Sequence, residues 1–238
     1  MQAQSTRCLR LPQQFNVAAL QQDVQRLRRL QWIQHYNNTA HQGRWECLPL
    51  RAANGDSGNI FASAEADFMD TPLLQQCPAV AHAVAAFACD KLAVRLMSLA
   101  AGARILPHRD AGGGFEDGVA RLHVPIFTDP RVLFEIDGET VHFGAGECWY
   151  MNANCLHAAH NGSPHERIHL VLDCVPNAWL RTLFTSAGWQ PNPAPEYGDA
   201  AINDANIQQV ISELMQNPSP AAQQLIVQLQ QKVASRKA

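Results

Sequence analysis

Long apolar runs and charge of one sign are both missing from this sequence. Among its 238 residues, no segment approaches the roughly 20 apolar residues that a membrane-spanning helix needs. Charged residues make up only 16% of the chain and the formal net charge is −3, so no nucleic-acid or membrane partner is expected. The N-terminal stretch also lacks the apolar centre of a secretory signal. Together these absences favour a soluble protein, which we expect in the cytoplasm.

Paired cysteine spacing is absent as well. The seven cysteines are odd in number, and none of them are spaced as Cys-x-x-Cys. Neither a disulfide framework nor a zinc knuckle is therefore expected. A reducing compartment fits this pattern best.

The central part of the chain shows the alternation of apolar and polar residues that is typical of strands. Eight short runs have this character: RWECLPLRA, LAVRLMSLA, ARILPHRD, ARLHVPIF, RVLFEID, TVHF, ECWYMN and RIHLVLDCV. Turn signals such as AGGG, TDP and DGE separate them, and helices do not alternate with them. We therefore predict a mainly β fold with flanking helices, whose core is a double-stranded β-helix (jelly roll, cupin-like).

Helical spacing of apolar residues appears on both sides of this β region. It predicts helices over residues 16–36, with Asn16 as the cap, and over 78–90. A further helix is expected over 178–187. A Pro-rich linker at 190–199 follows, and two more helices are expected after it, within 203–217 and from Pro220 onward. We expect residues 1–177 to form the barrel domain with its N-terminal helices, and 178–238 to form a helical extension packed on it.

The segment PHRD places two metal-ligand types on one side of a strand. Successive side chains point to opposite faces, so His108 and Asp110 share a face while Arg109 points away. A His-x-Asp pair with one distant histidine can present three ligands on one face of a six-coordinate iron. The spacing alone is a weak signal, so its context must support it.

That context is a later run that begins at His157. Arg167 lies ten residues further on and opens the apolar stretch RIHLVLD, where His169 and Asp173 share its face. A guanidinium that opens such a strand needs an anion, because burying an unpaired charge is very unfavourable. A dicarboxylate cosubstrate would supply one.

The strand ARLHVPIF adds two more polar groups that share a face, Arg121 and His123. His123 alone is better explained as an ordinary core histidine with a hydrogen-bond partner. Together with Arg167 and the proposed ligands, however, these groups would be hard to satisfy without a bound molecule.

The ordered set of motifs PHRD, RLHVPI, GECWYMN and LHAAHNGSPHERIHLVLD resembles the aspartyl/asparaginyl β-hydroxylase family of iron(II) and 2-oxoglutarate dependent oxygenases. That family has a double-stranded β-helix fold. The GRWE stretch at 43–46 makes the chain most similar to the bacterial free-proline cis-hydroxylase branch. The matching motifs span roughly residues 43–175.

The resemblance implies a role for each matching position. Three residues would bind Fe(II): His108, Asp110 and His157. Arg167 would pair with the far carboxylate of 2-oxoglutarate through two hydrogen bonds, and His123 would contact the near carboxylate. Arg121 would hold a carboxylate of the substrate.

The activity implied is a dioxygenase that uses O2 to hydroxylate an unactivated C–H bond of a free amino acid or small derivative. Two alternatives stay open: hydroxylation of a peptidyl or carrier-tethered Asp or Asn type residue, and a cupin-like metal enzyme that does not use 2-oxoglutarate. The second would leave Arg167 unexplained. A non-catalytic barrel would be expected to lack at least one ligand. The expected partner is a small molecule, and the strand pattern does not set an oligomeric state.

Overall fold

The computed structural model describes residues 6–61, 66–191, 197–199, 201–216 and 219–235. Its chain forms two compact units, Thr6–Gln190 and the residues from Pro191 onward.

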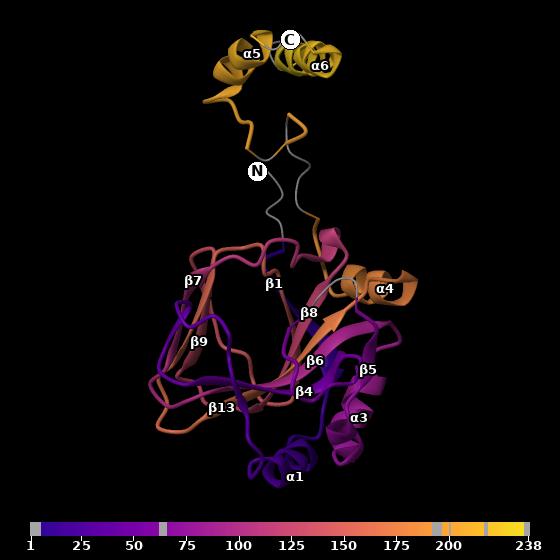
Figure 1. Cartoon of the computed structure of the whole chain (residues 1–238), viewed down its shortest axis with the longest axis vertical. Coiled ribbons are helices and arrows are strands. Elements are labelled where there is room, and N and C mark those ends of the chain that lie inside the picture. Colours follow the sequence, from indigo (N-terminus) through magenta and orange to yellow (C-terminus); the bar gives the residue numbers. More distant parts are fainter. Residues whose placement is uncertain (1–5, 62–65, 192–196, 200, 217–218, 236–238) are drawn as a thin grey trace. The chain divides into compact units, whose positions relative to one another are not determined.

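The larger unit contains two antiparallel sheets that enclose a barrel interior (Figure 1). The eight-stranded sheet has the order β1 (Cys8–Gln14), β11 (Glu147–Met151), β8 (Ala120–Phe127), β13 (Arg167–Cys174), β6 (Lys91–Leu99), β4 (Trp45–Ala53) and β2 (Ile33–Gln34), with β5 (Phe68–Asp70) paired to β4. The five-stranded sheet has the order β10 (Glu139–Val141), β9 (Val132–Ile136), β12 (His157–Asn161), β7 (Arg104–His108) and β3 (His41–Gln42). This arrangement confirms the predicted double-stranded β-helix.

Strand β13 lies in the middle of the larger sheet and pairs with both β8 and β6. Its alternating side chains separate two environments. Ile168, Leu170 and Leu172 join the apolar cluster on the outer face of the sheet. Arg167 and Val171 line a cavity on the inner face, as the alternation predicted.

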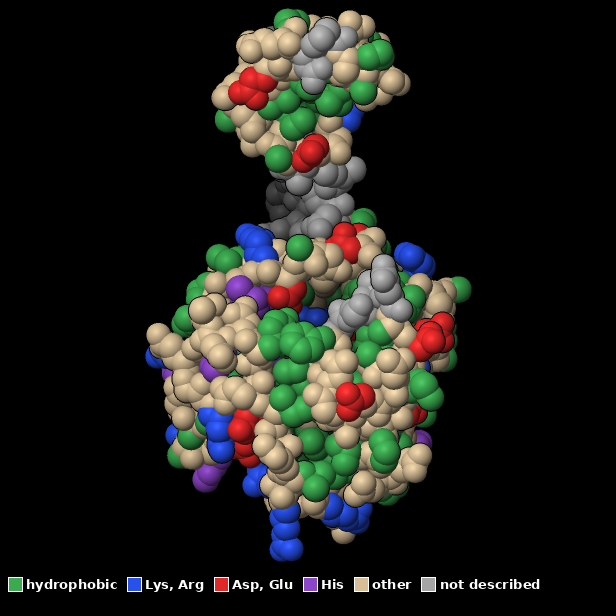
Figure 2. Space-filling model, in the orientation of Figure 1, with side chains coloured by type: hydrophobic (Ala, Val, Ile, Leu, Met, Phe, Trp, Pro, Cys, Tyr) green, Lys and Arg blue, Asp and Glu red, His purple; other side chains and the backbone are tan. Residues whose placement is uncertain are grey.

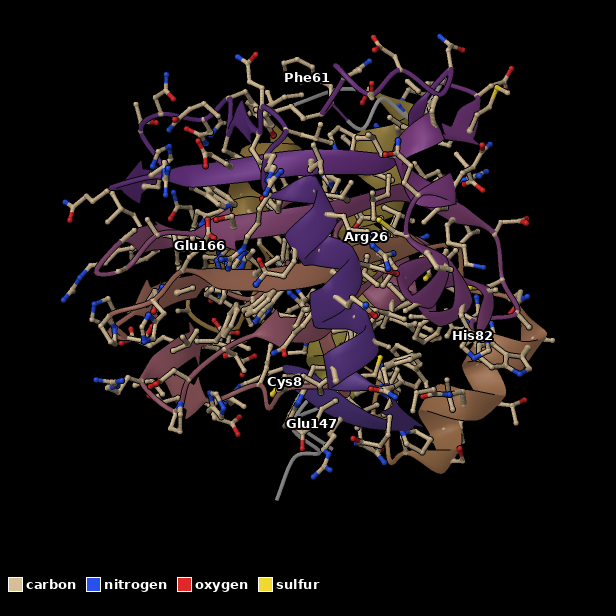
Figure 3. All side chains as sticks on the ribbon, turned by 90° about the horizontal axis from the view of Figure 1, so that it is seen from below. Cys8, Arg26, Phe61, His82, Glu147 and Glu166 are labelled. Atoms are coloured by element: carbon tan, nitrogen blue, oxygen red, sulfur yellow. The ribbon has the colours of Figure 1, made fainter. Side chains whose placement is uncertain are left out.

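The helices of this unit are α1 (Val17–Leu27), α2 (Pro72–Gln75), α3 (Pro78–Ala85) and α4 (Ala178–Ser186), and a 3-10 turn covers Phe115–Asp117. Buried residues of α1, α3 and α4 pack with the outward side chains of the larger sheet. Figure 3 shows α1 lying across the strands of this sheet. The inner face therefore remains available for the barrel interior.

Helix α1 is shorter than the predicted range of 16–36, because it ends at Leu27. The indole of Trp32 donates to the Leu27 carbonyl at 3.3 Å, and Ile33–Gln34 then pairs with β4. The ring of His35 stacks on Trp45 with centroids 3.6 Å apart. Pairing with a distant strand thus overrides the local helical pattern. The predicted helix over 78–90 likewise ends early, at Ala85.

The second unit contains α5 (Ile207–Met215) and α6 (Pro220–Ser235), which pack on each other around Tyr197, Ile211 and Leu229. Helix α4, which was expected in the C-terminal extension, lies in the larger unit. Its Leu180 and Phe184 are fully buried in the core there. Packing of the remaining tail on the barrel stays a prediction. None of the helices in the described ranges is long and apolar enough to span a bilayer.

Candidate metal centre and anion pocket

Two histidines meet at one rung of the smaller sheet. Strand β7 ends at His108, β12 begins at His157, and these two residues are Cα partners in the antiparallel ladder. Their ring centroids are 4.3 Å apart. Asp110 follows β7 and donates its backbone N–H to the Ala153 carbonyl at 2.9 Å. One ligand atom from each of these three side chains lies within 4.8 Å of the other two.

Hydrogen bonds to the backbone leave one nitrogen of each histidine free. Nδ1 of His108 lies 2.8 Å from the Leu106 carbonyl, and Nδ1 of His157 lies 3.0 Å from the Cys155 carbonyl. A carbonyl only accepts, so each Nδ1 carries the proton and each Nε2 keeps its lone pair. Burial also lowers the pKa of His157. Both rings are therefore oriented as metal ligands commonly are.

Asp110 is held as a carboxylate by Arg121. Its Oδ2 accepts from Nη1 of Arg121 at 2.5 Å, while Oδ1 lies 3.7 Å from Nε2 of His108. Burial alone would raise the pKa of Asp110, but the Arg121 charge and hydrogen bond hold it below the usual range. Two imidazole nitrogens and one carboxylate are the donor set of non-heme iron(II) oxygenases. The residues present thus fit such a metal ion.

A chain of charges runs from Asp110 away from the centre. Arg121 donates from Nε to Oδ1 of Asp173 at 2.8 Å, and Arg95 donates to Oδ2 of the same carboxylate at 2.5 Å. Burial opposes ionisation of Asp173, but the two guanidinium groups hold its pKa at about 2. Arg95 and Asp173 were not among the predicted site residues. The sequence did contain a signal for Arg95, because this residue interrupts an apolar strand as Arg121 does.

Arg121 was expected to hold a substrate carboxylate, and that role stays a prediction. In the structure its guanidinium already contacts two carboxylates, those of Asp110 and Asp173. Its Nη2 is the least engaged nitrogen, at 3.4 Å from Oδ2 of Asp173.

Arg167 has a different environment from the other buried arginines. The residue is only 2% exposed, and none of the described residues offers it a carboxylate within ion-pair distance. Its Nε is buried without a partner, and burial lowers its pKa to about 10. Its guanidinium carbon lies over the ring of Phe134, 5.7 Å from the ring centroid. A buried cation of this kind calls for an anionic ligand.

The predicted metal ligands and Arg167 line one cavity. Its wall is formed by Trp45, Met97, Ile105, His108, Asp110, Arg121, His123, Phe134, Met151, His157, Ala158, Ala159, Arg167 and Val171. Besides Arg167, two buried nitrogens in this wall find no partner among the residues that the structure describes: Nε2 of His123 and Nε1 of Trp45. All six residues predicted for the site therefore face a common space. Figure 2 shows that acidic and basic side chains are scattered over the face in view and do not gather in one charged patch there.

Comparison with known proteins identifies the family. Residues 14–176 match the family described as aspartyl/asparaginyl beta-hydroxylase, and the chain belongs to this family. It is 28% identical over 176 residues to a protein from Rhizobium meliloti (strain 1021) named L-proline cis-4-hydroxylase. That match covers 71% of this chain, and the chain spans 62% of the length of this relative.

Solved structures with partial similarity include an oxidoreductase of the 2OG-Fe(II) oxygenase family from Burkholderia pseudomallei. It has a TM-score of 0.45 and 12% identity, and the match covers 67% of this chain and 76% of that one. A nickel complex of the non-heme monooxygenase ThoJ gives a TM-score of 0.43 at 16% identity, with 72% and 74% of the chains covered. A cupin-like protein from Thermotoga maritima gives 0.35 at 11% identity, with 61% and 80% covered.

Proposed function

We propose that this protein is an iron(II) and 2-oxoglutarate dependent dioxygenase that hydroxylates an unactivated C–H bond of a free amino acid or small derivative. One observation carries the proposal: the two histidines, the aspartate and an otherwise unpaired buried arginine line the same cavity. Membership of the aspartyl/asparaginyl beta-hydroxylase family supports the reaction class. The name of the Rhizobium relative supports an amino acid as substrate.

Each wall residue has a role in this proposal. His108, Asp110 and His157 hold iron(II), and the iron with 2-oxoglutarate and O2 supplies the oxidising chemistry when bound. Arg167 pairs with the far carboxylate of the cosubstrate through two parallel hydrogen bonds. His123 donates from Nε2 to the near carboxylate.

Arg121 has two tasks. Through Nη1 it fixes Oδ2 of Asp110, so that Oδ1 is left for the metal. Its weakly engaged Nη2 is available for a carboxylate of the substrate. We assign the protein to the cytoplasm, a location supported by its seven cysteines, all of which are free thiols.

A cupin-like enzyme that does not use 2-oxoglutarate would need the three metal ligands but not Arg167. Burying a cation against the cavity without a partner would then have no compensation. For this reason we favour a reaction that uses a dianionic cosubstrate.

The test is reconstitution of the full chain with Fe(II), ascorbate and 2-oxoglutarate under 18O2. The substrate panel begins with L-proline and other free amino acids and continues with short Asp and Asn peptides. We expect one free amino acid to gain a single 18O atom, with succinate formed in equal amount. Turnover of the peptides alone would instead support the peptidyl alternative.

Two variants make the test specific. His108→Ala should abolish coupled product formation, and Arg104→Ala should leave it within about twofold, because Arg104 is exposed on the neighbouring part of β7. Product formation that survives His108→Ala, or that needs no 2-oxoglutarate in the wild type, would contradict the proposal.

A further inference from the structure

Behind His123, which lines the cavity, lies another buried histidine. His169 lies on β13 two residues beyond Arg167, and its side chain is fully buried. Its Nδ1 is 3.5 Å from Nδ1 of His123, at the long end of hydrogen-bond distances. This is the one hydrogen-bond contact that either ring makes among the described residues. Nε2 of each ring has no partner in the described part of the chain.

The two rings share a mostly aromatic surrounding. The ring of Phe134 stacks on His169 with centroids 5.7 Å apart, and it contacts His123 edge-on at 5.8 Å. Burial, together with the nearby Arg167 charge, lowers the pKa of both histidines well below the usual value. Each ring is therefore neutral near neutral pH and carries one proton on one of its two nitrogens.

A hydrogen bond between these two Nδ1 atoms allows only two proton arrangements in neutral rings. In the first, His169 donates from Nδ1, so His123 accepts there and presents Nε2–H to the cavity. In the second, His123 donates from Nδ1 and presents a bare Nε2 lone pair to the cavity. Only the first suits an anion beside Arg167, because a lone pair facing a carboxylate is repelled, whereas an N–H donates to it.

We infer that His169 is a positioning residue that fixes the tautomer of His123, so that Nε2–H of His123 points at the carboxylate of a bound keto diacid. This inference rests on the proposed function and deepens it, since His169 is not among the residues that line the cavity. His169 acts by keeping a proton on its own Nδ1 and donating it in a hydrogen bond to Nδ1 of His123.

The first experiment reads the protons directly. The full chain is labelled with 15N in its histidine rings and loaded with Zn(II), which is diamagnetic, and then saturated with 2-oxoglutarate. Ring 15N shifts distinguish protonated from bare nitrogens. Spectra of His169→Asn and of the exposed-site variant His82→Gln help to assign the signals. We expect His123 to be protonated at Nε2 and His169 at Nδ1 in the complex.

The second experiment uses two variants of nearly equal shape. Asparagine can place an amide N–H where Nδ1 of His169 lies, and leucine fills the same space without a donor. Calorimetric titration of the Zn(II) proteins with 2-oxoglutarate should give about fivefold to tenfold weaker binding for His169→Leu, the effect of losing one neutral hydrogen bond. His169→Asn should bind within about twofold of the wild type.

The outcomes separate this inference from the proposed function. Wild-type Zn(II) protein that fails to bind 2-oxoglutarate would overturn both. Binding with a bare Nε2 on His123, or equal binding by the asparagine and leucine variants, would overturn the role of His169 alone. If His169→Leu does not fold, the wild-type ring shifts still decide the question.

Discussion

Arg167 is a residue whose burial is unfavourable until a ligand arrives. Arg167 is 2% exposed, its guanidinium lacks a carboxylate partner among the described residues, and burial lowers its pKa to about 10. Such a group destabilises the ligand-free fold while preparing the site for an anion. Stability and cosubstrate binding should therefore respond to its replacement in opposite directions.

We predict that Arg167→Met raises the free energy of unfolding of the ligand-free protein by about 1–3 kcal/mol, because an unpaired buried cation is replaced by an apolar chain of similar length. The same variant should raise the 2-oxoglutarate KM by at least about thirtyfold. Urea unfolding and steady-state kinetics measure the two effects. The control is Arg131→Met, whose arginine is exposed and pairs with Asp129. A destabilised Arg167→Met protein with an unchanged KM would contradict the prediction.

Asp173 has the opposite character, since it is a buried anion with two cationic partners. Its pKa is held at about 2 in the folded protein, against about 3.9 for an unfolded aspartate. Its ionised form thus contributes stability that is fully present above about pH 4 and is lost as the pH falls toward 2.

We predict that Asp173→Asn lowers the free energy of unfolding by about 3–5 kcal/mol at pH 7, because Arg95 and Arg121 lose their shared carboxylate. The difference from the wild type should shrink as the pH falls below 4. Urea unfolding at pH 7, 5, 4 and 3 measures this. A difference that stays constant down to pH 3 would show that the carboxylate charge is not responsible.

For single residues, the alternation of side chains along a strand predicted which of them share a face. It placed Arg167 with Asp173 and Arg121 with His123, and the structure has both pairs on the inner face. It could not predict that Arg121 contacts Asp110, because that contact joins different sheets. Nor does a strand pattern say whether a buried arginine is already paired, which separates Arg95 from Arg167.

Among the elements, helix α3 depends on a side chain of helix α1 for its cap. Oδ2 of Asp23 accepts the backbone N–H groups of Ala79 and Val80 at 2.7 and 3.0 Å, where Cys77 provides no side-chain cap. Asp23 is 2% exposed, so water cannot replace these bonds. The carboxylate also suits the positive end of the helix.

We predict that Asp23→Ala lowers the free energy of unfolding by about 2 kcal/mol, because two buried N–H groups lose their acceptor. Cosubstrate binding should not change, since α3 packs on the outer face of the larger sheet. Urea unfolding and calorimetric titration check the two statements. Gln22→Ala, on the exposed side of α1, serves as the control. Equal stability of the two variants would contradict the capping role.

The sequence pattern predicted the long elements well and the short ones poorly. Strands β4, β6, β8 and β13 were all expected, because each alternates or is apolar over eight or nine residues. Strand β2 has only two residues and exists through its pairing with β4, so no local periodicity could show it. The same pairing explains why the helix expected to reach residue 36 ends at Leu27.

For the whole molecule, the cavity and its supports lie in one unit. Every residue of the cavity wall falls within Thr6–Gln190, and the ends of this unit are joined by hydrogen bonds between Thr6 and Gln190. The helices α5 and α6 have a small apolar core of their own.

We predict that a chain truncated after Gln190 keeps its melting temperature within about 4 °C and binds 2-oxoglutarate as the full chain does. For a unit of this size, a change of 1 kcal/mol in the free energy of unfolding shifts the melting temperature by about 2–4 °C. Thermal unfolding and calorimetry of the Zn(II) protein test this. A larger fall in melting temperature, or loss of binding, would show that the tail supports the barrel.

Strand β13 is the last barrel strand in the sequence, yet it is inserted between β8 and β6. During synthesis, the eight-stranded sheet cannot complete its native pairing until residues 167–174 have emerged from the ribosome. The arginine for the anion and the aspartate that anchors Arg121 both arrive with this strand. A nascent chain that stops short of it therefore lacks the sheet's central strand and its anion site alike.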